Sequence, residues 1–133
     1  MGAVVVGYVA KPEGEAAVEQ GIAEARLRNA ALIVVNSHRG GRDFDSDDST
    51  RVDQDLAALE AKLKASGLDY DVRQLVRGFE PAEDLISIAE TSDADLIVIG
   101  LRRRTPVGKL ILGSNAQRIL LDAHCPVLAV KAD

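Results

Sequence analysis

Five short apolar runs alternate with four longer stretches in which apolar residues recur at helical spacing. The runs extend from Ala3 to Val9, Ala30 to Asn36, Tyr70 to Val76, Leu96 to Ile99 and Val127 to Lys131. The helical patterns extend from a turn at residues 11–14 to about Asn29, from Ser49 or Thr50 to about Ser66, from Pro81 to near Asp93, and from Ser114 to about Ala123. This alternation predicts one doubly wound α/β domain over residues 1–133, a Rossmann-like fold with a five-stranded parallel sheet and helices on both faces.

The polarity of each run predicts its place in the sheet. Leu96 to Ile99 is apolar at every position, which is typical of a parallel strand covered on both faces. Tyr70 to Val76 alternates more, which favours an edge position. With the first strand central, the ligand crevice lies between the first and fourth strands, flanked by the turns after Val9 and Ile99. The stripe predicted for the first helix comprises Ala17, Val18, Ile22, Ala25 and Leu27.

The segment after the fourth strand has the composition of an anion-binding loop. Gly100, Gly108 and Gly113 allow a positive φ or the close approach of a bulky ligand, because no Cβ stands in the way. Ser114 falls at the predicted helix start, where a hydroxyl and free N–H groups face a bound anion. The loop also contains four cations, Arg102, Arg103, Arg104 and Lys109. Together they indicate a ligand that carries phosphate, but ordinary turn and cap chemistry beside a solvated basic face is the alternative.

Composition narrows the function classes. The chain has 133 residues, a net charge of -5 and 3% aromatic residues, so its core consists of Val, Ile, Leu and Ala. Basic residues are scattered outside the loop after the fourth strand, which argues against general nucleic-acid binding, because that requires a broad positive face. The N-terminal MGAVVVGYV has neither a charged region nor a long apolar stretch. We therefore expect no secretory signal, no membrane span and a cytoplasmic location.

Two further features point away from metal and thiol chemistry. The polar segment Ser37–Thr50 contains Asp43, Asp45 and Asp47, which imitate the start of a calcium loop, but later positions lack the glycine and glutamate that such a loop needs. We expect a mobile acidic loop or lid there, without a metal. Cys125, the single cysteine, excludes an internal disulfide and is interpreted as a small buried residue and not as a nucleophile.

Other nucleotide-linked functions lack their motifs. The first strand is followed by YVAKPEG and not by the glycine fingerprint of a dinucleotide-dependent oxidoreductase, and no P-loop is present. A phosphoaccepting receiver domain would need aspartates near Val9 and Leu75, where this chain is apolar. No nucleophile–base pair, paired carboxylates or metal cluster can be placed. We therefore expect no enzyme, or at most slow and incidental ATP hydrolysis.

The chain resembles the universal stress protein family over essentially its whole length. Adenine-nucleotide-binding members of that family carry a glycine, two residues, a second glycine, nine residues, and then a glycine followed by serine or threonine. Gly100 matches the first position, and Gly113 and Ser114 match the last pair at the same spacing. The closing HCPVLAVK, from His124 to Lys131, is also similar to the family's last strand.

The resemblance implies a fold, a partner and a ligand. The implied strand order is 3-2-1-4-5, with a homodimer formed through the last strand, Val127 to Lys131. The implied ligand is ATP, or ADP or AMP, with Mg²⁺ as an optional companion. Gly100, Gly113 and Ser114 would contact phosphate or ribose, and backbone groups near Val34 or Val35 would meet the adenine. The complete set of candidate binding residues is Gly100, Arg102, Arg103, Gly108, Gly113, Ser114, Val9, Val34 and Val35, with no catalytic or metal-binding residue.

Two of these positions depart from the family's nucleotide-binding pattern. Val9 stands where nucleotide binders usually have an acidic residue in a VDGS-like turn, and the missing hydrogen bond is worth about 1 kcal/mol. Arg103 replaces the second glycine, but a guanidinium beside a phosphate contributes roughly 1.5–3 kcal/mol.

Two functional hypotheses remain. The first is a cytoplasmic, homodimeric stress-response protein that binds ATP or another adenine nucleotide as a signal, through ordering of Ser37–Thr50 and Leu101–Gly108. The second is a non-nucleotide-binding universal stress protein that serves as a dimeric interaction module, in which the glycines only shape the turn.

Overall fold

A computed structural model describes residues 2–8, 12–37, 46–75, 81–102 and 114–132, and these ranges contain all the predicted strands and helices. The strands are β1 (Ala3–Tyr8), β2 (Ala31–Ser37), β3 (Tyr70–Leu75), β4 (Leu96–Arg102) and β5 (Val127–Ala132). The helices are α1 (Pro12–Arg28), α2 (Ser46–Ser66), α3 (Pro81–Thr91) and α4 (Ser114–Asp122). Within the described ranges, none of the helices has the length and apolarity that crossing a membrane requires.

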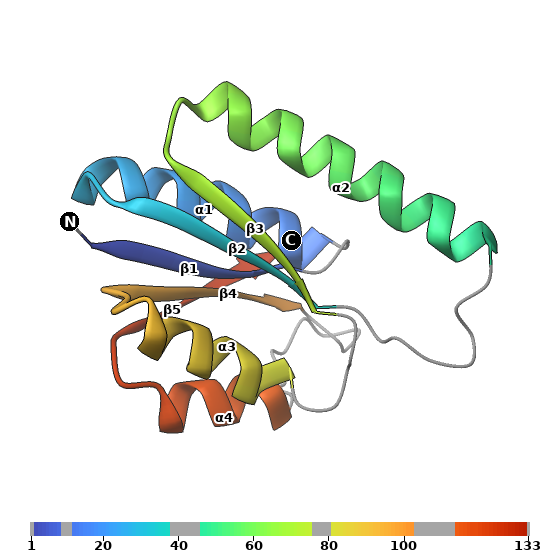
Figure 1. Cartoon of the computed structure of the whole chain (residues 1–133). Coiled ribbons are helices and arrows are strands. Elements are labelled where there is room, and N and C mark those ends of the chain that lie inside the picture. Colours follow the sequence, from blue (N-terminus) through green and yellow to red (C-terminus); the bar gives the residue numbers. More distant parts are fainter. Residues whose placement is uncertain (1, 9–11, 38–45, 76–80, 103–113, 133) are drawn as a thin grey trace.

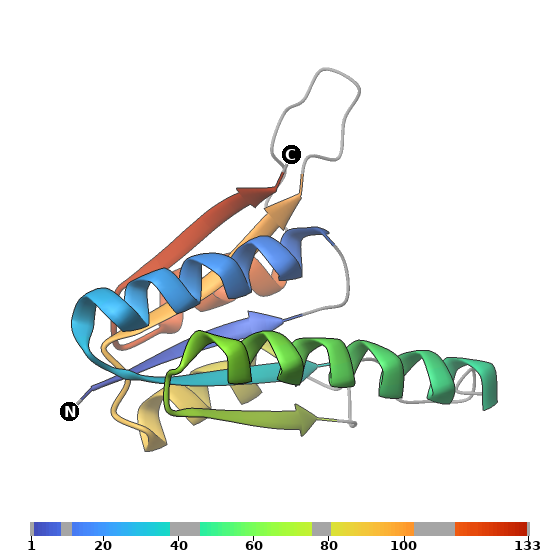
Figure 2. The same ribbon diagram turned by 90° about the horizontal axis from the view of Figure 1, so that it is seen from above.

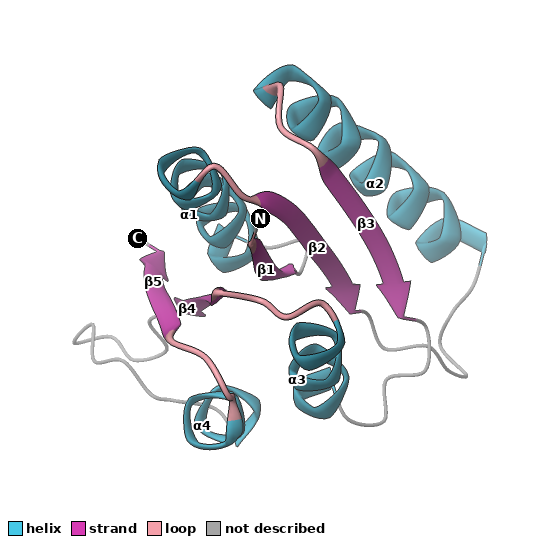
Figure 3. Cartoon of the chain, turned by 60° about the vertical axis from the view of Figure 1, so that its left-hand side comes forward, coloured by secondary structure: helices cyan, strands magenta, loops and turns pink. Residues whose placement is uncertain are grey.

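The strands form one sheet in the order β3-β2-β1-β4-β5, and every neighbouring pair is parallel (Figure 2). The α1 and α2 helices cover one face, whereas α3 and α4 cover the other (Figures 1 and 3). Crossovers between parallel strands are right-handed. The strands β2 and β3 lie on one side of β1, whereas β4 and β5 lie on the other side. The helices that lead to β4 and β5 therefore cover the opposite face of the sheet from α1 and α2. The predicted fold, the central first strand and the edge position of the third strand are confirmed.

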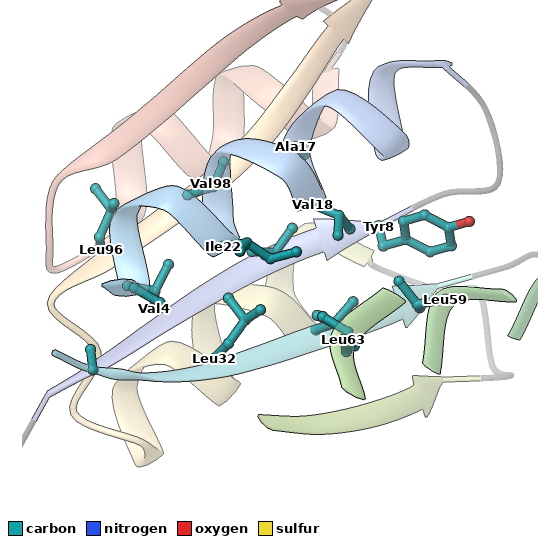
Figure 4. Close-up of a cluster of buried hydrophobic side chains, with 14 residues drawn as sticks. Val4, Tyr8, Ala17, Val18, Ile22, Leu32, Leu59, Leu63, Leu96 and Val98 are labelled. Atoms are coloured by element: carbon teal, nitrogen blue, oxygen red, sulfur yellow. The ribbon is translucent and has the colours of Figure 1, made fainter. Parts of the chain in front are cut away.

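Alternate residues of the sheet divide the core into two layers. Val4 and Val6 of β1 contact the layer under α1 and α2, whereas Val5 contacts the layer under α3 and α4; all three are completely buried. Figure 4 shows the first layer, in which Leu59 and Leu63 of α2 lie farther along β2 than Leu32, toward the carboxyl end of the strand. Because β1 is the middle strand of the sheet, its carboxyl end lies between those of β2 and β4.

Several element boundaries differ from those predicted. The α1 helix begins at Pro12, so Glu13 and Gly14 are helical and not part of a turn; proline is favoured at the first helical position because its φ is already fixed there. The α2 helix begins at Ser46, several residues before the predicted caps. Within the segment Ser37–Thr50, residues 46–50 therefore belong to a helix and residues 38–45 lie outside the described ranges.

Two further predictions are corrected. The β4 strand continues two residues past Gly100, and Arg102 pairs with Ala132 of β5, so Leu101 and Arg102 are not part of a loop. Leu27 is 79% exposed, although it was assigned to the buried stripe of α1. It follows Ala25 by two residues, which places it on nearly the opposite side of a helix with 3.6 residues per turn.

Candidate functional site

A cavity of about 180 Å³ lies where the carboxyl ends of β1, β2 and β4 meet the starts of α1 and α4. This is the point at which the strand order reverses, as the sequence predicted for the crevice. Its lining residues are Gly7, Tyr8, Glu13, Gly14, Val35, Ala82, Leu85, Ile99, Gly100, Asn115, Ala116 and Ile119. The floor and the sides are mainly apolar, and the polar groups stand at the rims.

Gly7 leaves the floor of the cavity hollow. It pairs with Val35 on β2, and both residues line the cavity. A β-carbon added to Gly7 would lie 3.2 Å from Cδ2 of Leu85 and 3.7 Å from Cγ2 of Ile99. A glycine in a strand interior often marks such a close approach, here between the sheet and the side chains of α3.

Gly100 brings β4 into direct contact with the start of α1. A β-carbon on Gly100 would be 1.9 Å from the backbone oxygen of Glu13, a separation that no real pair of atoms tolerates. Any other residue at position 100 would therefore push α1 away from β4. The glycine is needed for this packing whether or not a ligand is bound.

Glu13 contributes to the α1 rim of the cavity. The residue lines the cavity and is partly exposed. Its Oε1 atom is buried and has no hydrogen-bond partner among the described residues. Buried polar atoms are normally paired, because an unpaired one loses its hydration without compensation. This oxygen is enclosed by protein atoms and is not open to the cavity.

The α4 rim presents backbone N–H groups. Asn115 and Ala116 in the first turn of α4 line the cavity, and the first N–H groups of a helix have no partner within it. Ile119 anchors the helix in the core, and Arg118 pairs with Glu83 of α3. The N-terminus of α4 is thus held in place at the cavity, with the positive end of its dipole directed toward a bound group.

Tyr8 connects the cavity to α1 and α2. Its ring is buried at the end of β1 with the hydroxyl pointing away from the core (Figure 4), and the hydroxyl donates a hydrogen bond of 2.9 Å to Glu15 Oε1. Lys62 of α2 donates to the other oxygen of Glu15 at 3.4 Å and also pairs with Glu19. The hydrogen bond that Lys62 donates to Glu19 is the main cause that raises the pKa of the lysine, so Lys62 is charged and ties the two helices together.

The structure brings together some of the predicted binding residues. Gly100 and Val35 line the cavity, whereas Val34 is completely buried in the other core layer, because adjacent strand residues face opposite sides. Ser114 is the first residue of α4 and Arg102 the last of β4; for both, the description covers the backbone alone. Val9, Arg103, Gly108 and Gly113 lie outside the described ranges.

Sequence reasoning missed three of the residues that shape the cavity. Gly7 carried a signal, since an isolated glycine in a strand pattern indicates a close approach. Asn115 directly follows the predicted helix start, so its position at the α4 rim was implicit. Glu13 had no signal, because one glutamate near a helix start is ordinary and only the packing against Gly100 brings it to the cavity.

Cys125 lies away from the cavity, half-buried against the core layer under α3 and α4. Burial raises the pKa of its thiol, and the carboxylate of Asp95 raises it further. A raised pKa leaves less of the nucleophilic thiolate, which argues against a nucleophilic role. The residue is only half-buried, however, and not fully buried as predicted. Among the described residues, no group of three or more His, Cys, Asp or Glu side chains is placed to hold a metal ion.

Known proteins match this chain over nearly its whole length. The model of the universal stress protein family matches residues 1–131. A universal stress protein of Mycolicibacterium smegmatis is 46% identical over 128 residues, which cover 96% of each chain. The structure of a universal stress protein from Archaeoglobus fulgidus has a TM-score of 0.78 and 35% identity, with 98% of both chains covered.

A second structure from Archaeoglobus fulgidus, a universal stress protein in complex with dAMP, has a TM-score of 0.72 and 30% identity, again over 98% of both chains. The family match, the sequence identity and the shared fold agree with one another. The chain therefore belongs to the universal stress protein family.

Proposed function

We propose that this protein binds an adenine nucleotide in the cavity between β1, β4 and α4, and that it acts in the stress response or in signalling as a homodimer. The cavity carries the proposal, because it combines an apolar floor with polar rims at the strand-order reversal. Its volume, about 180 Å³, is below the roughly 300–1,000 Å³ of pockets that enclose a drug-sized ligand. It would therefore enclose one part of a nucleotide and leave the rest at the rims.

The chemistry of each wall supports a position for each part of the ligand. The side chains of Val35 and Ile99 offer an apolar surface for the faces of a base. The first turn of α4, with Ser114 and Asn115, offers free N–H groups and a positive dipole end to phosphate. Gly100 also lines the cavity, and its backbone is proposed to contact the phosphate or ribose; the space left by its missing Cβ is filled by the backbone of Glu13.

A relative supports the choice of adenine nucleotides. The Archaeoglobus fulgidus protein with 30% identity was solved with dAMP bound, and its chain aligns with nearly all of this one. We propose ATP, ADP or AMP as the ligand here. Since no metal-ligand cluster is present among the described residues, a Mg²⁺ ion that accompanies ATP would be held mainly by the phosphates.

Calorimetric titration of the purified protein with AMP, ADP and ATP tests this proposal. We expect saturable binding, and at a free ligand concentration about 100 times the Kd we expect stabilisation of about 2.7 kcal/mol. Ser114→Ala should weaken binding of all three nucleotides if the hydroxyl holds phosphate. Flat titrations together with unchanged melting at millimolar nucleotide would favour the alternative, a dimeric interaction module that binds no nucleotide.

The homodimer is proposed to form through β5. This strand lies at the sheet edge, and Val127, Leu128, Ala129 and Val130 are each only partly buried within the single chain. An edge strand with unpaired backbone groups and partly exposed apolar side chains is suited to pairing with a second copy. A dimer would cover these residues.

A further inference from the structure

The row of residues on the floor of the cavity has a gap in its middle. Val35 of β2 and Ile99 of β4 are buried in the core layer under α3 and α4, and Gly7 of β1, the strand between them, has no side chain. Alternation along β1 places position 7 on the same face as Val5, which fills its place in that layer. All three residues of the row line the cavity, so the gap at Gly7 is part of it.

The strands on either side of this gap also separate. The parallel pairing of β1 with β4 ends at Val6 and Val98, although both strands continue to pair with their other neighbours, β2 and β5. Gly7 and Ile99 are both described by the structure and would form the next pair, but they are not paired. A missing side chain and the end of a strand contact therefore coincide at one place and form a single hollow.

The lining of the hollow limits what can enter it. Ala82 and Leu85 of α3 and Ile119 of α4 line the cavity from the side of the helices, which cover this face of the sheet (Figure 3). These apolar side chains offer no partner to a phosphate, which would lose its hydration there. An apolar cavity of roughly 150 Å³ can hold a benzene ring, so the volume of about 180 Å³ suits an aromatic ring system and not a whole nucleotide. The base is the part of a nucleotide that fits.

We propose that Gly7 is a specificity-determining residue, and that the hollow above it admits a two-ring base and so favours purine over pyrimidine nucleotides. A purine fills the apolar space more completely than a pyrimidine and gains more buried area and more close contacts. A side chain at position 7 would occupy this space, because its β-carbon would lie 3.2 Å from Cδ2 of Leu85 and 3.7 Å from Cγ2 of Ile99. This inference rests on the proposed nucleotide binding and assigns the selectivity for the base to one residue.

Calorimetric titration with AMP and CMP tests the role of Gly7. We expect the wild-type protein to bind AMP roughly tenfold or more tightly than CMP, and Gly7→Ala to reduce this ratio toward one. One methyl group in an apolar pocket typically changes affinity by roughly tenfold or more, and the larger base should lose most of it. Gly7→Ala should remain folded, because the atoms nearest to the added carbon belong to side chains.

A second substitution separates loss of space from general damage. Leu85→Ala, added to Gly7→Ala, removes the side chain that the new methyl group approaches, so the ratio should return toward the wild-type value. Val4→Ala is the matched control, because Val4 lies on the same strand, is completely buried in the layer under α1 and α2, and does not line the cavity. Its ratio should equal that of the wild-type protein. A ratio of affinities does not depend on the fraction of protein that is folded, so partial unfolding of a variant does not obscure the result.

The outcomes separate this inference from the proposed function. Equal affinities for AMP and CMP in the wild-type protein, or the same ratio in the wild-type protein and Gly7→Ala, would overturn the role of Gly7 and leave nucleotide binding intact. A ratio that stays low when Leu85→Ala is added would also overturn it, because lost space would then not be the cause. No binding of any adenine nucleotide by the wild-type protein would overturn both.

Discussion

Gly100 of β4 and Glu13 of α1 are in such close contact that a β-carbon on the glycine would be 1.9 Å from the backbone oxygen of the glutamate. This contact forms one wall of the cavity. Gly100 matches the first glycine of the family's nucleotide-binding motif, whereas α1 lies outside that motif. The contact therefore joins the motif to a distant part of the chain. A substitution at position 100 should therefore change both stability and binding.

Gly100→Ala should destabilise the protein by about 1–3 kcal/mol, because the added methyl group collides with backbone atoms that can move only with α1. Urea denaturation measures this change. Gly7→Ala is the matched control: its β-carbon would approach side-chain atoms alone, of which the nearest is Cδ2 of Leu85 at 3.2 Å, and the end of that side chain can move. We expect a clearly smaller loss of stability there. Equal losses in the two variants would contradict the importance of the contact with α1.

Asn115→Asp should weaken the binding of AMP and stabilise the protein slightly. A carboxylate in the first turn of α4 interacts favourably with the helix dipole, which contributes about 0.3–1 kcal/mol, but it repels a phosphate at the same place. Titration with AMP and thermal melting of the free protein measure the two effects.

Adenosine is the control ligand for this variant, because it carries no phosphate. Its affinity should be the same for Asn115→Asp and the wild-type protein. A parallel loss for AMP and adenosine would show that the substitution disturbs the cavity itself, and the phosphate would then not lie at α4.

Val130→Lys should shift the protein from dimer to monomer. The substitution places a charge on the edge strand β5, where the partly buried apolar residues are proposed to face a second copy. Sedimentation equilibrium should give twice the chain mass for the wild-type protein and a lower mass for the variant. Leu27→Lys, at a residue that is 79% exposed on α1, serves as the control and should remain dimeric. A wild-type protein that sediments as a monomer would rule out the proposed dimer.

Cys125 should react slowly with iodoacetamide in the folded protein. Burial and the Asp95 carboxylate raise the pKa of the thiol, so at pH 7.5 less thiolate is present than in the unfolded chain, and the rate should increase as the pH rises toward the raised pKa. The comparison is with the same protein in urea at the same pH. A folded protein that reacts as fast as the unfolded one would contradict a structural role.

Local patterns predicted the elements well and their ends less well. The all-apolar run Leu96–Ile99 indicated a strand covered on both faces, and its residues are buried as expected. The same pattern did not predict that β4 continues to Arg102, since pairing with β5 and not polarity extends it. Likewise, the start of α2 at Ser46 lies in a polar stretch without an apolar stripe to mark it.

The sequence by itself determined the α/β class and the order of the elements, because the period of hydrophobic residues is a local property. It also indicated that the last helix begins at Ser114, because capping preferences are local as well. It also carried the family pattern that implies strand order. Only the tertiary structure decided that Gly7 hollows the cavity floor, that Val35 and not Val34 faces the cavity, and that Glu13 is among the residues that line it. These depend on the face of the sheet and on the contact between Gly100 and α1, which join residues far apart in the chain. No local pattern can specify such a contact, because its energy depends on the positions of both partners.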